Sequence, residues 1–420
     1  MKWVNHGQYG NASINEMIKF KHPFSILLGK LSLGLISIFI ACLAGLYWKS
    51  PTLLTILRYR QPTPQTFRHF PQESIAASPD PFHFIKATHP RQDLDTLSVY
   101  DGRHRLLPLA DYLRMGKTTA FVVIRNDSII YQYYAPGFSD TTTASVFSIA
   151  KSVLAILVGC ALQEGAIRSL DDSITSYLPE LRKKPVFAGI TVRHLLTMNS
   201  GLAFKRKGEG LLSDLFSDEA LYFYTTDSKQ RLLQSQSATR PGTQWQYKNI
   251  DPLLLGWLLE VATHQRLAQY TQTKLWNPIG AAYPASWGLD HTGGLANTAS
   301  SFQTTPLDLA KIGRLFLLAQ QPRTIPLASA GWLNQLTQLD RTNNSPPKGW
   351  IQTRHQYYWW LPQRKPTGDF AAEGMLGQRL YVHPSTDTII VHLAEAGAGD
   401  YPYRKVAAYL GGQIFRYPER

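Results

Sequence analysis

Ser148 and Lys151 stand three positions apart at the start of a long apolar run, Val153 to Leu162. If this run is helical, positions i and i+3 share a face, and the lysine amine lies beside the serine hydroxyl. A serine hydroxyl needs an adjacent base at neutral pH, and a lysine held neutral can be that base. The spacing therefore indicates acyl transfer through a serine ester. A surface serine next to a solvated lysine would give the same pattern.

Three further segments strengthen this interpretation because they follow Ser-x-x-Lys in a recognisable order. They are Ile190 to Leu202, the Tyr247-Lys248-Asn249 triplet and Glu373 to Gln378. Together the four motifs resemble those of the serine hydrolase family that contains class C β-lactamases, D-alanyl-D-alanine peptidases and related esterases. The resemblance covers residues 95–415.

A narrower resemblance points to the branch of that family that contains the 6-aminohexanoate-dimer (nylon-oligomer) hydrolases. The segments that carry it are Thr118 to Asn126, Phe216 to Ala220, Gly293 to Ala299 and Trp359 to Leu361.

The resemblance implies a role for each matched residue. Ser148 is expected to be the nucleophile and Lys151 the base that takes its proton. Tyr247 is expected to pass a proton to the leaving group, with Lys151 stabilising its charged form. Asn249 is expected to hydrogen-bond the lysine or the substrate amide. His194 is expected to pack and to fix a loop rather than to catalyse.

The third motif departs from the lactamase pattern, in which Lys-Thr-Gly or His-Thr-Gly occupies the strand beside the serine. Counting back from Gly377 without gaps places Asp369-Phe370-Ala371 at those positions. Ala372 would then supply a backbone N–H to an oxyanion hole with the N–H of Ser148, and Gly377 would belong to the same substrate-binding set. An acid at the position of the lactamase cation predicts weak recognition of substrates that carry a carboxylate.

Composition excludes several other classes. The 420 residues carry 43 Lys and Arg against 29 Asp and Glu, a net charge of +14. The charge is dispersed and no nucleic-acid-binding motif accompanies it, so a nucleic-acid partner is not expected. Cys42 and Cys160 both lie in apolar runs and do not form a disulfide framework. The twelve histidines show no metal-ligand spacing, so a zinc site is not expected. The resemblance to serine hydrolases implies a reaction that needs neither a metal nor an organic cofactor.

The N-terminal hundred residues divide into three parts. Residues 1–22 form a polar leader, residues 23–48 a membrane anchor, and residues 49–99 a proline-rich linker or wrapping segment. Leu31 to Trp48 is uncharged and just long enough to span a bilayer, although a cleaved signal peptide is the alternative. Flanking charges do not decide the orientation. We expect a single-pass membrane protein with its catalytic domain on the periplasmic or extracytoplasmic side.

The remaining residues, 100–418, are predicted to form one hydrolase domain of α+β class. Ala120 to Arg125 and Ser128 to Tyr134 predict a hairpin, and the Ser148 helix should end near Gly165. Residues 166–290 read as a mainly helical insertion, after which strands return. We therefore expect an antiparallel sheet flanked by helices, as in β-lactamases and transpeptidases, preceded by one transmembrane helix. The other predicted elements are helices at Leu253 to Ala262, Leu267 to Trp276, Thr305 to Ala319 and Tyr401 to Phe415, and strands at Tyr357 to Leu361, Gln378 to His383 and Thr388 to Ala394.

These observations predict a membrane-anchored serine hydrolase that acts on a small-molecule amide or ester. Two alternatives stay open at this point. One is a D-amino-acid peptidase that acts on peptidoglycan fragments. The other is a binding or scaffold protein that keeps the pocket without turnover. The sequence indicates neither the physiological substrate nor the oligomeric state.

Overall fold

The structure is a computed structural model of the chain. It describes residues 34–38, 40, 51–101, 105–206, 217–320, 329–340, 345–346, 353–362, 368–396 and 402–412. The chain forms two compact units, Met1–Thr55 and Ile56–Arg420. The second unit holds all the strands of the described residues.

The hairpin expected around Asn126-Asp127 is present and lies toward one edge of the larger sheet, next to the last strand. Both turn residues adopt left-handed φ angles, 50° and 58°, as a tight two-residue hairpin turn requires. Side chains alternate between the two faces of the sheet, so Val122 packs on one side and Phe121 on the other, and both are fully buried. The sheet is therefore covered on both faces, in agreement with the layered α+β fold expected from the sequence.

Within the described residues the larger sheet has eight strands and the smaller sheet four. All pairs are antiparallel except β2 with β6. In spatial order the larger sheet contains β10 (Thr353–Gln356), β11 (Trp359–Pro362), β12 (Phe370–Glu373), β13 (Arg379–His383), β14 (Thr388–Ala394), β5 (Thr118–Arg125), β6 (Ser128–Tyr134) and β2 (Ile85–Lys86). The smaller sheet contains β1 (Gln72–Ile75), β8 (Ala285–Gly288), β9 (Phe302–Thr304) and β7 (Ala144–Ser145). β3 (Ser98–Tyr100) pairs with β4 (Leu106–Pro108).

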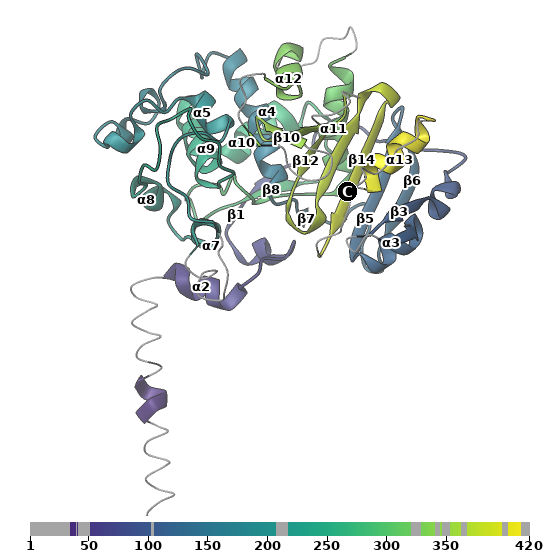
Figure 1. Ribbon diagram of the computed structural model, residues 1–420, viewed down its shortest axis with the longest axis horizontal. Helices are drawn as coiled ribbons and strands as arrows, with labels where there is room; N and C mark the ends of the chain where they lie inside the picture. The colour runs from purple at the N-terminus through teal and green to yellow at the C-terminus, as the bar shows by residue number, and fades with distance from the viewer. Residues whose placement is uncertain are drawn as a thin grey trace, which may run out of the picture. The chain divides into compact units, whose positions relative to one another are not determined.

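Helices cover the two faces of the larger sheet (Figure 1). α11 (Pro306–Leu318) packs on β13, β14 and β5. α3 (Leu109–Met115) and α13 (Pro402–Leu410) supply the core on the opposite face. The predicted helix at Thr305 to Ala319 is thus confirmed, and Pro306 begins it as expected. The helix predicted at Tyr401 to Phe415 is confirmed from Pro402 to Leu410, where a turn at Gly411 and Gly412 follows it; residues 401 and 413–415 lie outside the described residues.

α4 (Ile149–Gln163) is the helix that begins after Ser148, and every residue from Ile149 to Ala161 on it is buried. It packs between β12 of the larger sheet and α9 (Ile250–Thr263) of the helical region. An all-apolar helix of this kind is stable only when it is surrounded on all sides. Because α4 is buried on all sides, the backbone at its N-terminus, where Ser148 lies, is held in a fixed position.

The helical region between α4 and β8 was predicted as residues 166–290. Its described elements include α9 and α10 (Leu267–Thr271), which confirm two predicted helices, although the second continues as the π-helical turn η7 (Gln272–Trp276). The other described elements are η4 (Ile174–Ser176), η5 (Pro179–Leu181), η6 (Pro185–Phe187), α5 (Val192–Leu196), α7 (Asp218–Tyr224) and α8 (Ser228–Leu233). α12 (Ala330–Leu336) follows α11 and packs on α4.

The predicted strand at Tyr357 to Leu361 is only partly correct. Tyr357 and Tyr358 have φ angles of 43° and 71° and form the turn between β10 and β11. The sequence suggested a strand because both tyrosines favour extended structure. Ser152 of α4 donates a hydrogen bond of 2.7 Å to the carbonyl of Tyr358, so this turn is fixed to α4.

The segment at residues 49–99, expected to be a proline-rich linker, is largely part of the folded domain. It contains α2 (Pro51–Tyr59), η2 (Thr66–His69) and η3 (Gln92–Thr96), and it supplies β1 to the smaller sheet. Phe67 and Ile75 in this segment are buried in the core. Its prolines prevent long helices and strands but allow short ones. Of the two expectations, a segment that wraps around the domain describes residues 49–99 better than a free linker does.

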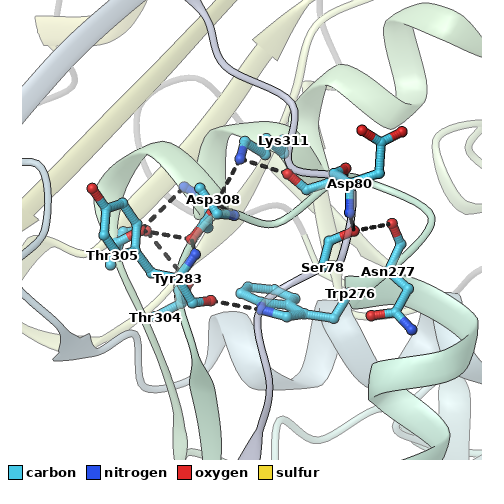
Figure 2. Close-up of polar contacts among 11 residues, drawn as sticks. Ser78, Asp80, Trp276, Asn277, Tyr283, Thr304, Thr305, Asp308 and Lys311 are labelled. Carbon is cyan, nitrogen blue, oxygen red and sulfur yellow. Dashed lines mark hydrogen bonds and ion pairs between the residues drawn. The ribbon is translucent and has the colours of Figure 1, made fainter.

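A buried ion pair on α11 holds the loop at residues 280–283, and the N-terminal segment hydrogen-bonds to the same loop through Ser78 and Phe82 (Figure 2). Lys311 lies 2.8 Å from Asp308 and donates a hydrogen bond of 2.7 Å to the carbonyl of Gly280. Asp308 also accepts hydrogen bonds from two backbone N–H groups. Ser78 donates to the carbonyl of Asn277 in the same cluster. Because both charges are almost fully buried, these bonds compensate for their lost hydration.

The predicted membrane anchor, residues 23–48, lies outside the described residues except for 34–38 and 40. Across the part of the chain that is described, no helix combines the length and the hydropathy needed to cross a bilayer. The anchor therefore stays a prediction.

Candidate active site

Ser148 occupies the position immediately before the first residue of α4, with its side chain half-buried. The carbonyl of Ser148 accepts the backbone N–H of Lys151, which continues the helical turn. The preceding residue, Phe147, has a left-handed φ of 47°. This turn directs the hydroxyl to the positive end of the helix, where developing negative charge is stabilised.

Lys151 reaches back from the first turn of α4 to the serine. Its Nζ lies 3.0 Å from the Oγ of Ser148 and donates a hydrogen bond of 2.6 Å to the carbonyl of Ala299. The lysine is 1% exposed, and burial lowers the pKa of its amine from 10.5 to about 7, while the charge of Glu219 acts in the opposite direction. A substantial fraction of the amine is neutral near pH 7, as a base for Ser148 must be.

Tyr247 completes the constellation from the loop before α9. The Nζ of Lys151 lies 5.1 Å from the centre of its ring, and the side chain of Ser148 acts to lower the pKa of its hydroxyl. Burial raises the pKa of the Tyr247 phenol to about 12, and the nearby carboxylates of Glu373 and Glu219 act in the same direction. In the resting protein burial thus favours the protonated phenol, and stabilisation of a tyrosinate by Lys151 stays a prediction. A protonated phenol suits donation of a proton to a leaving group.

Aromatic side chains surround the tyrosine and limit its motion. The rings of Trp245, His355 and Trp360 have their centres between 5.8 and 6.5 Å from that of Tyr247. Trp360 stacks on it and belongs to β11, while His355 belongs to β10. The β10–β11 hairpin therefore forms one wall of the site.

The two neighbours of Tyr247 are bound to the loop at residues 198–204, so the backbone of the tyrosine is held from both sides. Gln246 donates to the carbonyl of Phe204, and the buried Lys248 donates to the carbonyl of Leu202. Behind them Ser200 donates a hydrogen bond of 2.6 Å to Asp251. This loop is the second half of the Ile190 to Leu202 motif, so that motif supports Tyr247 structurally.

His194 is a structural residue, as the sequence predicted. Its Nδ1 accepts the backbone N–H of Thr191, while the threonine hydroxyl accepts the backbone N–H of His194. This reciprocal capping fixes the start of α5. A Cβ atom on Gly242 would lie 3.1 Å from Nε2 of the histidine, so the ring also supports the Pro241-Gly242-Thr243 turn before Tyr247.

Asn249, Ala372 and Gly377 keep the roles assigned by resemblance only as predictions. Asn249 is half-buried at the N-cap of α9, and its side chain makes no capping hydrogen bond there. Ala372 is fully buried in β12, on the sheet face that packs against α4. Gly377 ends the short η8 helix (Met375–Gly377) between β12 and β13, with a φ of 89°.

The position given to Asp369 by ungapped counting is wrong. Its carboxylate lies 3.2 Å from Arg404 of α13 and accepts a hydrogen bond from the hydroxyl of Tyr381. These partners belong to the sheet face away from α4, so Asp369 does not replace the lactamase cation. A shift of one residue in a strand moves every side chain to the other face of the sheet. Counting residues along the sequence does not determine which face a side chain occupies.

Two residues at the site were missed as functional residues. Gly374 lies against the serine turn, since a Cβ atom there would be 2.3 Å from the carbonyl oxygen of Val146. Glu219, on α7, affects the pKa of both Lys151 and Tyr247. Gly374 could have been recognised as the first glycine of the third motif. Glu219 carried no signal beyond its place in one of the segments that resemble the nylon-oligomer hydrolases.

Known proteins resemble this chain over much of its length. The family model described as Beta-lactamase matches residues 114–410. The 6-aminohexanoate-dimer hydrolase of Paenarthrobacter ureafaciens is 26% identical over 302 residues, which are 69% of this chain and 76% of that protein. The β-lactamase of Escherichia coli K12 is 30% identical over 165 residues, 36% of this chain and 40% of that protein.

Solved structures show the same fold. A protein of Bacillus anthracis assigned as a 6-aminohexanoate-dimer hydrolase has a TM-score of 0.71 and 21% identity, over 83% of this chain and 91% of that one. A D-alanine carboxypeptidase of Burkholderia cenocepacia has a TM-score of 0.50 and 19% identity, over 72% of this chain and 95% of that one. The family match spans more than half of the chain and includes the three residues that the structure brings together. The chain therefore belongs to the β-lactamase family of serine hydrolases.

Proposed function

We propose that this chain cleaves an amide or ester bond through an acyl-enzyme formed on Ser148. The observation that carries the proposal is the 3.0 Å approach of a buried lysine amine, with a pKa lowered to about 7, to the serine hydroxyl. A neutral amine at this distance can accept the proton when Oγ attacks a carbonyl carbon. A solvated surface lysine would have neither this burial nor this contact.

The remaining proton transfers follow from the position of Tyr247. When the carbonyl–leaving-group bond breaks, the phenol gives its proton to the departing amine or alkoxide, and the proton held by Lys151 replaces it. Water then attacks the ester on Ser148 with the same groups acting in reverse, which releases the acid and restores the serine. The backbone N–H of Ser148 would hold the oxyanion. A second N–H from Ala372 stays a prediction, because the count that placed Ala372 also misplaced Asp369.

The charges around the site favour substrates without a carboxylate next to the scissile bond. Glu219 and Glu373 both raise the pKa of Tyr247, and Arg206 is the cation that opposes them. Arg379 lies 3.7 Å from Glu373 and donates to two backbone carbonyls, so the charges of Glu373 and Arg379 partly offset each other. The specificity first inferred from Asp369 is thus retained as a proposal, but it rests mainly on Glu219.

The relatives suggest which amides to test. One relative is a 6-aminohexanoate-dimer hydrolase, and that dimer is a linear amide with a cationic amine at one end and a carboxylate at the other, both remote from the cleaved bond. The carboxylate of Glu219, which raises the pKa of Lys151 and Tyr247, would favour a cationic group over an anionic one beside the cleaved bond. We propose short linear amides and esters with a neutral or cationic group near the cleaved bond as the substrate class.

A substrate panel with the wild-type protein and Ser148→Ala tests the proposal. The panel contains p-nitrophenyl esters of increasing acyl length, 6-aminohexanoate dimer, a D-alanyl-D-alanine peptide and a chromogenic cephalosporin. We expect steady release of product from an ester or linear amide, and a loss on the order of 10⁴-fold in Ser148→Ala. Preferred turnover of the D-alanyl peptide would favour the peptidase alternative, and a single unreleased acyl group would favour the binding protein.

We also propose that the apolar run at Leu31 to Trp48 anchors the protein in a membrane, with the catalytic domain on the periplasmic or extracytoplasmic side. The support is its length and lack of charge. The full chain should sediment with membranes and resist carbonate extraction, whereas a truncated chain that begins at Ile56 should not. Full-length protein that stays in the supernatant with an intact N-terminus would contradict the anchor.

A further inference from the structure

The residue before the nucleophile holds an unfavourable backbone conformation. Phe147 has a φ of 47°, in the left-handed region that bulky side chains rarely occupy. Its N–H donates to the hydroxyl of Ser145, and its ring is fully buried. Such a conformation persists only when the surrounding structure enforces it, and here it sets the direction in which Ser148 leaves the turn.

A strap formed by residues 61–75 supplies part of that enforcement. Phe67 of the strap is 3% exposed, and its ring centre lies 6.3 Å from that of Phe147. The carbonyl of Pro64 accepts the backbone N–H of Ser145 at 3.0 Å. Arg68 donates to the carbonyl of Thr143 at 3.0 Å. The strap thus contacts the approach to the nucleophile at residues 143, 145 and 147, about 80 positions along the chain.

The same phenylalanine contacts the helix that carries Glu219. The ring centres of Phe67 and Phe223 lie 4.9 Å apart, and Phe223 belongs to α7. Glu219 is four residues before Phe223, so the two side chains share a face of that helix. Phe70 of the strap packs on Tyr224, with 6.1 Å between ring centres. Phe67 therefore lies between the serine turn on one side and the acidic helix on the other.

The strap is held in place independently of these contacts. Its strand β1 pairs with β8 from Gln72 to Ile75, and Gln72 also donates to the carbonyl of Phe67. β8 pairs with β9, and β9 with β7, which leads directly into the serine turn. One sheet therefore connects the strap to the residues before Ser148, and Phe67 adds a second, direct connection.

We propose that Phe67 is a positioning residue of the active site, which holds the turn before Ser148 and the helix that carries Glu219 in one fixed arrangement. The inference rests on the proposed function, because it concerns the same serine and lysine. It assigns to the N-terminal segment, which precedes the residues matched by the family model, a part in setting the catalytic geometry. Phe67 touches no reacting atom and acts through Phe147 and Phe223.

The test compares Phe67→Ala with Phe84→Ala in the full-length protein. Phe84 is another buried phenylalanine of the N-terminal segment, packed against Phe82, and it controls for loss of core volume. The readouts are the rate of Ser148 labelling by a fluorophosphonate and the midpoint of the acid limb of kcat/KM. We expect Phe67→Ala to slow labelling at least tenfold and to move the midpoint to lower pH, toward that of Glu219→Gln. Phe84→Ala should leave the midpoint unchanged.

Phe67→Leu keeps an apolar side chain without the ring, and this variant replaces Phe67→Ala in the comparison if the alanine variant does not fold. Its midpoint should also move to lower pH, by a smaller amount. Unchanged labelling and an unchanged midpoint in a folded Phe67 variant, or equal effects in the Phe84 variant, would overturn the positioning role. A wild-type protein that is not labelled at Ser148 would instead show that the proposed function has failed.

Discussion

The acid limb of the pH–rate profile should report the protonation of Lys151. Burial lowers the pKa of this amine from 10.5 to about 7. At pH 7 an amine with the ordinary value would be neutral in about one molecule in 3,000, whereas one with a pKa near 7 is neutral in about half. The site therefore increases the supply of the active base by about 10³-fold.

The measurement is kcat/KM for a p-nitrophenyl ester between pH 5 and pH 9, with enzyme stability checked at each pH. We expect a limb with a midpoint near 7 and a fall of about tenfold per pH unit below it. No descending limb is expected below pH 9, because the pKa of Tyr247 is raised to about 12. Lys151→Arg keeps a charge but cannot accept a proton, so it should lose on the order of 10³-fold or more, nearly as much as Lys151→Ala.

Two results would refute this reasoning. A rate that is constant from pH 5 to pH 9 would mean that the amine does not titrate in this range. Substantial activity in Lys151→Arg would mean that position 151 needs only a positive charge. In either case Lys151 would not be the base.

Glu219→Gln should move the same midpoint to lower pH, because the carboxylate raises the pKa of Lys151; a midpoint that stays or rises would exclude this coupling. Neutral esters should exceed a chromogenic cephalosporin in kcat/KM by at least about tenfold after correction for intrinsic reactivity, since a charge-assisted contact is worth about 1.5–3 kcal/mol. Burial raises the pKa of Asp251 from 3.8 to about 6, so this carboxyl group binds its proton more tightly in the folded protein than in the unfolded one. Its contribution to the free energy of unfolding therefore falls as the pH rises from about 4 to 6. Asp251→Asn should therefore raise the free energy of unfolding more at pH 8 than at pH 4, by up to about 2–3 kcal/mol in denaturant titrations. Gly159→Ala should lower Tm, at a cost of about 1–3 kcal/mol, because its Cβ atom would lie 1.9 Å from the ring of Trp332.

Residues close together in the sequence could be predicted well. The i, i+3 spacing of Ser148 and Lys151 was sufficient to place the amine beside the hydroxyl, because a helix brings that pair together whatever else the chain does. The hairpin at Asn126-Asp127 was also predicted, since both residues tolerate left-handed φ. Tyr247 was placed by resemblance to a family, and no local rule would have brought it to the serine.

Features that depend on long-range register could not be predicted. Counting in the third motif placed Asp369 in the site, but strand pairing turns it toward Arg404 on the far face of the sheet. The contact of Phe67 with Phe147 joins residues far apart in sequence, and the prolines around Phe67 suggested a linker. A chain shortened to begin near residue 75, which a linker would have tolerated, would lose this contact.

Mass spectrometry of the protein trapped with a fluorophosphonate or a slowly hydrolysed ester tests the central claim most directly. The account predicts one added group, located after proteolysis on the peptide that contains Ser148, and no added group in Ser148→Ala. Addition to another residue, or equal addition in the Ser148→Ala variant, would contradict it.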